Sequence, residues 1–503
     1  MEVIHGMLHG FEVALTPINL WWCFVGVFLG TVVGVLPGLG PPATIAMLLP
    51  LTFQMSPTSA VIMLAGIYYG AKYGGSTTSI LLNVPGESAS VVTCLDGYQM
   101  AKKGRAGAAL GIAAIASFIA GTVGVLGLML VAPPLARFAL SFSSPEYFAL
   151  MCLGLAMVVL LAGHSLVKAL LAMLVGLWIA GIGTDLFSDA SRFTFDRMEL
   201  LDGIDFVVVA IGVFALGEVL GNMESREEAQ LLPVPKGLRN LLPTLQELKD
   251  CRFAFLNGSV VGFVIGVLPG AGSTIASFIS YGIEKAVSRH PEKFGTGVPE
   301  GVAAPEGANN SETGGAMVPL LTLGIPGSGT TAILLAAFIL WGLRPGPLMI
   351  QDNPDLFWGL VASMYVGNVM LLILNLPLIP LFAQILKLPV YILYPIIFGI
   401  SIVGVYSVSG SLFDIGILAL FGLLGYAMRK LDYPSAPLIL GLVLGDNMER
   451  ALRQSLMMSE GSPAILVSRP ISAVMLFLAA AILIVPLFKR VNAWRIKAIE
   501  EQL

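Results

Sequence analysis

Four Pro-Gly dipeptides interrupt apolar stretches of the chain, at Pro37-Gly38, Pro85-Gly86, Pro269-Gly270 and Pro326-Gly327. Proline removes a backbone hydrogen-bond donor, and glycine permits close approach and unusual dihedral angles. Broken backbone at membrane depth leaves polar groups that protein, water or a ligand must satisfy. The free N–H groups and the dipole at the start of a helix attract anions. The breaks therefore predict a site for an anionic substrate; a plain proline kink in a packed helix is the alternative for each.

Two small polar stretches precede the second break of each half, at residues 74–78 (GGSTT) and 309–315 (NNSETGG). Their hydroxyl, amide and carboxylate oxygens suit a carboxylate substrate on one side and a coupling cation on the other. Helix capping and close packing through glycine are the alternative interpretation. Lys72 would attract an anion and Glu312 would take part in cation or proton coupling, because an ionisable residue within the membrane is costly. The alternative for Lys72 is that its side chain extends to place the ammonium group at the membrane interface.

The candidate residues follow from these stretches. The substrate-binding candidates are Pro37, Gly38, Gly40, Gly74, Gly75, Ser76, Thr77, Thr78, Pro85, Gly86, Pro269, Gly270, Gly272, Ser273, Thr274, Pro326, Gly327 and Ser328. The ion-coupling candidates are Asn83, Asn309, Asn310, Glu312 and Thr313, with Lys72 as a charge partner for the substrate. We expect no cofactor and no metal other than Na⁺, with Na⁺ or H⁺ as the coupling ion.

The breaks belong to a sequence repeat. Residues 26–40 (GVFLGTVVGVLPGLG) and 258–272 (GSVVGFVIGVLPGAG) are identical at nine of fifteen positions, at an offset of 232. The second breaks, at 83–88 and 324–329, match at an offset of 241. Matching interruptions of apolar segments in two halves indicate a transporter site, and such repeats are often inverted. Glycine at every fourth position, 26, 30, 34 and 258, 262, 266, predicts closely packed helix faces.

Composition indicates a polytopic membrane protein. The 503 residues are 56% hydrophobic and 12% charged, about half the usual charged fraction of roughly 25%. This length allows about ten to fourteen membrane segments. The net charge of −4 and the absence of a basic patch give no reason to expect nucleic-acid binding. No Lys or Arg precedes Lys72, so we expect no cleavable signal.

We expect an all-α membrane protein with two homologous, inverted repeats and broken, re-entrant helices. The predicted parts are a first repeat at 1–222, a polar linker at 223–252, a second repeat at 253–488 and a cytoplasmic tail at 489–503. The segment 57–73 is expected to be a span ending at the polar stretch, and 288–313 to be a polar loop. Glu87 and Asp96 are expected in a hydrated loop. Basic residues at 102–105, 226–252 and 489–497 place these segments on the cytoplasmic side and the N-terminus outside.

Enzyme signatures are weak. The chain has no GxxxxGK[ST], HExxH or paired CxxC motif, and its four cysteines are scattered. We therefore do not expect an enzyme. A channel is the main alternative function, because re-entrant segments also build selectivity filters.

Several motifs resemble the large membrane subunit of the tripartite tricarboxylate transporters, the TctA type. They are GIYYGA at 66–71, YGGSTTSILLNVPGE at 73–87, LDGYQMA at 95–101, GRAG at 104–107, APEGANNSETGG at 304–315 and LGIPGS at 323–328. The resemblance covers about residues 15–490. It implies an ion-driven uptake system, or symporter, of the bacterial inner membrane that uses no ATPase. Its implied partners are a small membrane subunit of about four helices, a periplasmic solute-binding protein, membrane lipid, and a carboxylate substrate (a tri- or dicarboxylate or an aromatic acid).

Overall fold

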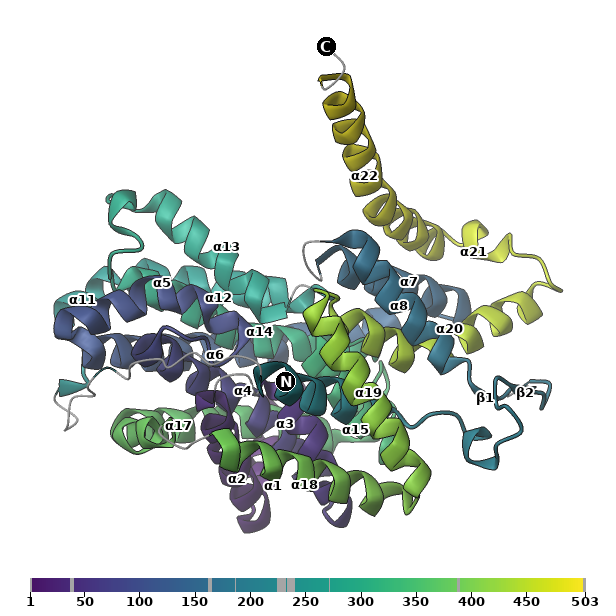
Figure 1. Ribbon diagram of the computed structural model, residues 1–503, viewed down its shortest axis with the longest axis horizontal. Helices are drawn as coiled ribbons and strands as arrows, with labels where there is room; N and C mark the ends of the chain where they lie inside the picture. The colour runs from purple at the N-terminus through teal and green to yellow at the C-terminus, as the bar shows by residue number, and fades with distance from the viewer. Residues whose placement is uncertain are drawn as a thin grey trace. The chain divides into compact units, whose positions relative to one another are not determined.

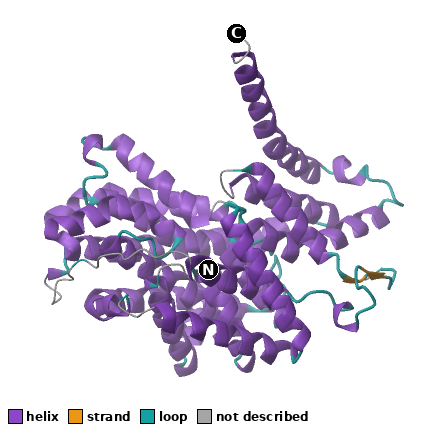
Figure 2. Ribbon diagram, in the orientation of Figure 1, coloured by secondary structure: helices purple, strands orange, loops and turns teal. Residues whose placement is uncertain are grey.

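The computed structural model describes residues 2–36, 40–161, 165–185, 187–223, 232, 240–270, 272–386 and 390–500. Most of these residues are helical, which confirms the predicted all-α class (Figure 2). The chain forms two compact units, one made of residues 1–140 and 205–435 and the other of residues 141–204 and 436–503. Most of the predicted linker, residues 224–231 and 233–239, lies outside the described residues.

The first unit contains the matching segments of both repeats, 26–40 with 83–88 and 258–272 with 324–329, and Figure 1 labels its helices. Its helices are α1 (Glu2–Ala14), α2 (Pro17–Val35), α3 (Pro41–Leu48), α4 (Pro57–Leu82), α5 (Val91–Met100), α6 (Ala106–Ala139), α9 (Phe206–Ala210), α10 (Gly217–Met223), α11 (Leu245–Asp250), α12 (Arg252–Val267), α13 (Gly272–Val287), α14 (Glu300–Leu323), α15 (Gly329–Leu340), α16 (Met349–Asp352), α17 (Pro354–Ile385), α18 (Val390–Ser409) and α19 (Leu412–Lys430). Short helical turns also occur between the helices of the chain: η1 (Leu49–Gln54), η2 (Ser88–Ser90), η3 (Ala101–Arg105), η4 (Met198–Leu200), η5 (Ile211–Leu216) and η7 (Pro291–Lys293). Of these, η4 belongs to the second unit.

The second unit contains α7 (Ser144–Leu161), α8 (Leu166–Ala180), α20 (Ser435–Met458), α21 (Ile465–Ser468) and α22 (Pro470–Glu500). A two-residue antiparallel hairpin, β1 (Gly183–Thr184) and β2 (Ser191–Arg192), follows α8. The carboxylate of Asp185 accepts hydrogen bonds from the backbone N–H groups of Phe187 and Ser188 and from Arg453, and these bonds lower its pKa. Helix α22 continues through residues 489–500, into the predicted tail.

The helix ends in the two repeats have matching causes. A residue that precedes proline disfavours the helical conformation, and Leu36 before Pro37 and Leu268 before Pro269 are both extended, with ψ of 113° and 119°. Helices α4 and α14 both end in the left-handed conformation, at Asn83 (φ 59°) and Gly324 (φ 69°). Asparagine and glycine are the residues that adopt this conformation most easily. The sequence therefore encodes the same pair of breaks twice.

Two sequence expectations about helix continuity are wrong. Residues 74–78 do not end a span, because α4 runs unbroken from Pro57 to Leu82. Residues 300–313 are not a loop, because α14 begins at Glu300 and includes the whole polar stretch 309–315. Both stretches are buried between neighbouring helices, so their glycine, alanine and serine residues permit close packing rather than a turn. Because these stretches are polar in composition, the sequence does not indicate that they are buried.

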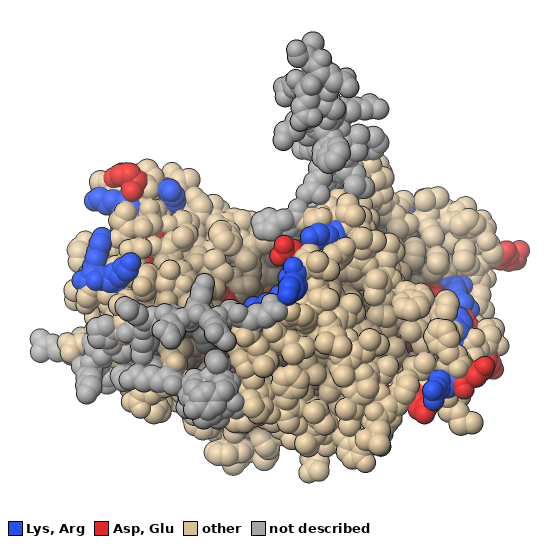
Figure 3. All heavy atoms as spheres, in the orientation of Figure 1, with Lys and Arg blue, Asp and Glu red and all other residues tan. Residues whose placement is uncertain are grey.

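Five helical stretches among the described residues are long and apolar enough to cross a membrane: Pro17–Val35, Ser88–Ala139, Phe206–Met223, Pro354–Ile379 and Leu412–Lys430. Shorter apolar helices accompany them, including Arg252–Val267 and Gly329–Leu340. Figure 3 shows a surface on which charged side chains are few and gather in small patches. Large apolar side chains such as Trp21 and Ile373 are more than half exposed. These features are those of a multi-pass membrane protein.

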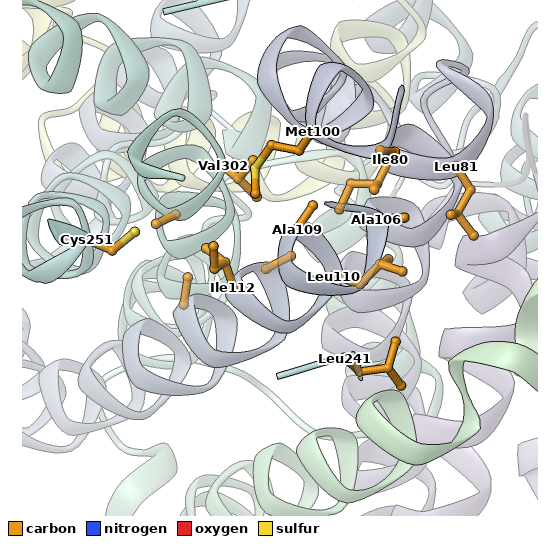
Figure 4. Packing of buried hydrophobic residues seen from close by; sticks show 14 of the residues in the cluster. Ile80, Leu81, Met100, Ala106, Ala109, Leu110, Ile112, Leu241, Cys251 and Val302 are labelled. Carbon is orange, nitrogen blue, oxygen red and sulfur yellow. The ribbon is translucent and has the colours of Figure 1, made fainter. Parts of the chain in front are cut away.

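One core of the first unit joins the two repeats. Ile80 and Leu81 of α4 and Met100 of α5 pack with α6 and with Val302 of α14, as Figure 4 shows. Leu110 of α6 belongs to the same fully or nearly fully buried cluster. Burying such side chains stabilises the fold by about 1.5–3 kcal/mol each. The core therefore holds α4, α5 and α14, which carry most of the candidate residues, against one another.

Candidate functional site

The glycine stripes bring corresponding helices together in the two repeats. A Cβ atom on any of these glycines would collide with a backbone carbonyl oxygen of the facing helix. In the first repeat α2 meets α4 through the pairs Gly26–Met63, Gly30–Ile67 and Gly34–Ala71. In the second repeat α12 meets α14 through the pairs Gly258–Ala304, Gly262–Ala308 and Gly266–Glu312. The glycines are 232 residues apart and the carbonyl residues 241 apart, the same two offsets that relate the sequence breaks.

The second break of each repeat lies beside the end of its glycine stripe. Gly86 packs against Gly34 and Gly75, and a Cβ atom added to the corresponding Gly327 would lie 3.5 Å from the carbonyl oxygen of Gly266. In the second repeat the backbone N–H of Gly270 donates to the carbonyl of Gly327 at 2.7 Å. The two Pro-Gly breaks of the second repeat are therefore joined directly. Pro37 and Gly38, which hold the corresponding position in the first repeat, lie outside the described residues.

Lys72 connects the repeats. Its ammonium group donates to the hydroxyl of Ser273, at the start of α13, at 2.5 Å, and lies 3.1 Å from the carboxylate of Glu87. The same group lies 5.4 Å from the ring centroid of Tyr68. Only 3% of the Lys72 and Glu87 side chains is exposed, so the side chain of Lys72 does not extend to the protein surface. Thr274, the next residue of α13, donates to the hydroxyl of Ser88 at 3.0 Å.

A second connection joins α4 to α14. The hydroxyl of Tyr68 donates to one carboxylate oxygen of Glu312 at 2.9 Å. The other oxygen of Glu312 and both polar side-chain atoms of Asn309 are buried and have no hydrogen-bond partner in the described part of the chain. Asn309 and Glu312 are three residues apart on one helix and therefore share a face. Buried polar atoms without a partner are uncommon and need an explanation, such as an ion or water.

Of the remaining candidates, three have hydrogen-bond partners within the protein and one is exposed. Asn310 donates to the Ser117 hydroxyl at 2.7 Å, Thr313 donates to the carbonyl of Asn310, and Thr78 donates to the carbonyl of Val35. These side chains are satisfied within the protein. Asn83 is exposed and ends α4, so the structure does not bring it to Asn309 and Glu312.

The start of each half-helix has a different neighbour. The carboxylate of Glu218 on α10 lies close to the backbone N–H of Gly40, which precedes α3. The protein's own carboxylate therefore holds the position at which we expected an anion. The start of α13 instead meets Lys72 through Ser273. Ser328 caps α15 and exchanges hydrogen bonds with Thr331.

Sequence reasoning did not predict the burial of three carboxylates near the candidate residues, Glu87, Asp96 and Glu306. Glu306 is fully buried in α14 and accepts hydrogen bonds from Ser76 and Thr93. Asp96 is also fully buried, and it accepts from the backbone N–H groups of Gly297 and Val298 at 2.7 and 2.9 Å. The prediction that Glu87 and Asp96 lie in a hydrated loop is therefore wrong. No sequence signal was available for Glu306, because residues 288–313 were expected to be a loop and only the buried helix α14 marks this carboxylate as a candidate.

A multi-pass helical membrane protein with a duplicated core and a buried polar cluster between its halves has the features of a transporter subunit. The profile of the tripartite tricarboxylate transporter TctA family matches residues 20–440, and the chain belongs to this family. The resemblance seen in the sequence is thereby confirmed. Within the described residues, no group of three or more His, Cys, Asp or Glu side chains is placed to hold a metal ion.

Two relatives come from Agrobacterium vitis. An uncharacterized 52.8 kDa protein in the TAR-I ttuC' 3'region is 47% identical over 502 residues, which cover the full length of both chains. An uncharacterized protein in the TAR-II ttuC' 3'region is 43% identical over 234 residues, which cover 46% of this chain and 97% of the relative. No solved structure gives a significant match to this chain.

Proposed function

We propose that this chain is the translocation subunit of an ion-gradient-driven carboxylate transporter that depends on a binding protein. Its substrate is a tri- or dicarboxylate or an aromatic acid, and its membrane is the bacterial inner membrane. Its partners are a small four-helix membrane subunit and a periplasmic solute-binding protein. The single observation that carries the proposal is the contact between Lys72 of the first repeat and Ser273 at the start of α13 in the second.

The substrate site lies at the start of α13. A helix N-terminus favours a carboxylate through its N–H groups and dipole, and Lys72 supplies a full positive charge beside it. Glu87 now pairs with Lys72, so a substrate carboxylate competes with Glu87 for the ammonium group. The first repeat is less favourable for an anion, because the carboxylate of Glu218 lies close to the backbone N–H of Gly40. This asymmetry supports one principal carboxylate position.

The coupling cation binds at Asn309 and Glu312. Their buried, unpartnered oxygens lie on one face of α14, and carboxylate and amide oxygens suit hard cations such as Na⁺. A proton on Glu312 is the other form of coupling. Asn310 and Thr313 shape this part of α14 through their own hydrogen bonds. We further propose that the two repeats are inverted and that α2–α3 and α12–α13 are re-entrant pairs. The N-terminus is then external and the C-terminus cytoplasmic.

Uptake of labelled citrate, succinate and benzoate into proteoliposomes tests this function. The chain is reconstituted with its small subunit, with or without the binding protein, under separate Na⁺ and H⁺ gradients. Accumulation that needs the binding protein and an ion gradient supports the proposal. Flux that only equilibrates, without either, contradicts it and favours a channel.

A further inference from the structure

Glu306 is a buried carboxylate to which the proposed function assigns no role. It lies in α14, fully buried, where one oxygen accepts from Ser76 of α4 and the other from Thr93 of α5. None of the ion pairs formed by the described residues includes Glu306. An ionised carboxylate in such surroundings is very costly, and proteins usually avoid that cost by keeping the group neutral.

The hydrogen bonds of Ser76 are better satisfied when Glu306 carries a proton. A serine hydroxyl has one hydrogen to donate, yet the Ser76 hydroxyl lies against two acceptors, Glu306 and the carbonyl of Lys72 at 3.1 Å. A protonated Glu306 donates to Ser76, Ser76 then donates to the Lys72 carbonyl, and Thr93 donates to the second carboxyl oxygen. Every hydroxyl hydrogen in this series of hydrogen bonds then has an acceptor.

The charges around Glu306 also favour the neutral form. Lys72 and Glu87 act on it through space, but they already form an ion pair with each other. Tyr73 and Cys94 are the other titratable groups that interact with it. The charged residues of α6, α12 and α13 lie at helix ends, at Arg137, Arg252, and Glu284 and Lys285, whereas Asp96 in the middle of α5 accepts from the backbone N–H groups of Gly295, Gly297 and Val298. No full positive charge is therefore left for Glu306 alone.

A small cavity lies beside Ser76. Its walls include Ser76, Tyr73 and Thr77 of α4, Ser117 of α6 and Asn375 of α17, and it offers about 10 Å³ to a water-sized molecule. This volume is enough for about one water. The side-chain oxygen of Asn375 is buried without a partner in the described residues, so it is an acceptor for that water. Ser76 contacts both the cavity and Glu306, and so connects them.

We propose that Glu306 binds and releases a proton during transport, which makes H⁺ a coupling ion in addition to any cation at Asn309 and Glu312. The inference rests on the proposed function for its role in transport. In the step itself, a proton enters the cavity as a hydronium ion; Ser76 gives its hydroxyl hydrogen to a carboxylate oxygen of Glu306 and receives one from the hydronium, which becomes neutral water, and the charge of Glu306 changes from −1 to 0. Release reverses this transfer.

Infrared spectroscopy tests the protonation without any transport assay. The reconstituted complex at neutral pH should show the carbonyl stretching band of a protonated carboxyl group. That band should be lost or reduced in Glu306→Gln and kept in Glu300→Gln, a control at the partly exposed start of the same helix. A band that is absent from the wild type, or unchanged in Glu306→Gln, overturns the inference.

Transport then tests the coupling. Glutamine imitates the protonated acid, so Glu306→Gln should still exchange internal for external labelled citrate but should lose accumulation driven by a proton gradient. Full proton-driven accumulation by Glu306→Gln overturns the inference and leaves the carboxylate transporter intact. Wild-type accumulation that does not depend on the proton gradient also overturns the inference and leaves the carboxylate transporter intact. If the wild type transports none of the three acids, the proposed function fails, and the infrared band still decides whether Glu306 is protonated.

Discussion

The ammonium group of Lys72 and the carboxylate of Glu87 form a buried ion pair at 3.1 Å in the first repeat. At the offset of 241, the corresponding positions of the second repeat hold Thr313 and Ser328. The two repeats therefore share their helix geometry but differ in charge at the centre. In the proposed site, one repeat offers a cation to the substrate and the other offers a helix N-terminus.

Removing one member of this pair should destabilise the protein more than removing both. Lys72→Met leaves the carboxylate of Glu87 unpaired, and Glu87→Met leaves the ammonium group unpaired; each should cost about 3–5 kcal/mol. The double variant, with two apolar side chains of similar volume, should recover most of that loss. Thermal unfolding of the purified protein in detergent measures all three. Losses that simply add in the double variant would contradict a direct pairing.

The prolines of the first breaks should matter for transport more than for folding. Pro37→Ala and Pro269→Ala permit the preceding leucines to continue the helix, which removes the break at the proposed site. We expect strongly reduced uptake with near-normal expression. Pro134→Ala, a change at an exposed proline inside the continuous helix α6, is the control and should leave uptake unchanged. Normal uptake by the Pro37→Ala/Pro269→Ala double variant would sink the idea of a break site.

The glycine stripes should tolerate no added methyl group. A Cβ atom at Gly30 would lie 2.6 Å from the carbonyl oxygen of Ile67, and one at Gly258 would lie 2.7 Å from that of Ala304. Gly30→Ala and Gly258→Ala should each destabilise the protein by about 1–3 kcal/mol through overpacking. Gly282→Ala in α13 adds a methyl group with nothing within 4 Å and should be neutral or stabilising by about 0.5–1 kcal/mol. Equal melting temperatures for all three variants would refute close packing.

The repeat and its breaks could be predicted from the sequence because their causes are local. Proline and glycine act on their own backbone, so Leu36, Leu268 and Gly324 adopt the expected conformations wherever the rest of the chain lies. Close helix packing was predictable for the same reason, because it depends on glycine at every fourth position.

The course of α14 and the partners of its carboxylates could not be predicted in this way. A run such as Asn309–Gly315 is polar enough to be a loop, and only its burial between α6 and α12 makes it helical. The partners of Glu306 are more than two hundred residues away in sequence, at Ser76 and Thr93. Contacts of this kind depend on tertiary packing, which no local pattern records.

The stability of the contact between α1 and α17 should depend on pH through His9. Its imidazole lies 2.6 Å from the carboxylate of Asp355, and this hydrogen bond raises the pKa of His9 above 6.5. A raised pKa stabilises the folded protein below the unfolded value of about 6.5, and that contribution is lost as pH rises through the folded value. The pair is largely exposed, so its worth is below about 1 kcal/mol. The difference in melting temperature between wild type and Asp355→Asn should therefore shrink from about pH 5 to 8; a constant difference would contradict the pairing.

Asp96 should hold the loop that leads into α14. Its carboxylate accepts from the backbone N–H groups of Gly295, Gly297 and Val298, just before α14 begins at Glu300. An amide in its place offers one acceptor oxygen and turns N–H groups toward these donors. Hydrogen bonds to a charged group contribute about 1.5–3 kcal/mol each, so Asp96→Asn should weaken the loop by at least about 2 kcal/mol.

Hydrogen exchange measures this directly in Asp96→Asn. The amides of Gly297 and Val298 should exchange faster in the variant, while amides in the middle of α14 keep their protection. Glu292→Gln, an exposed change in the same loop, should leave both amides as slow as in the wild type. Because α14 carries Glu306, Asn309 and Glu312, the same variant should also reduce substrate uptake. Unchanged exchange at Gly297 and Val298 would mean that the loop is held by other contacts and that Asp96 does not position α14.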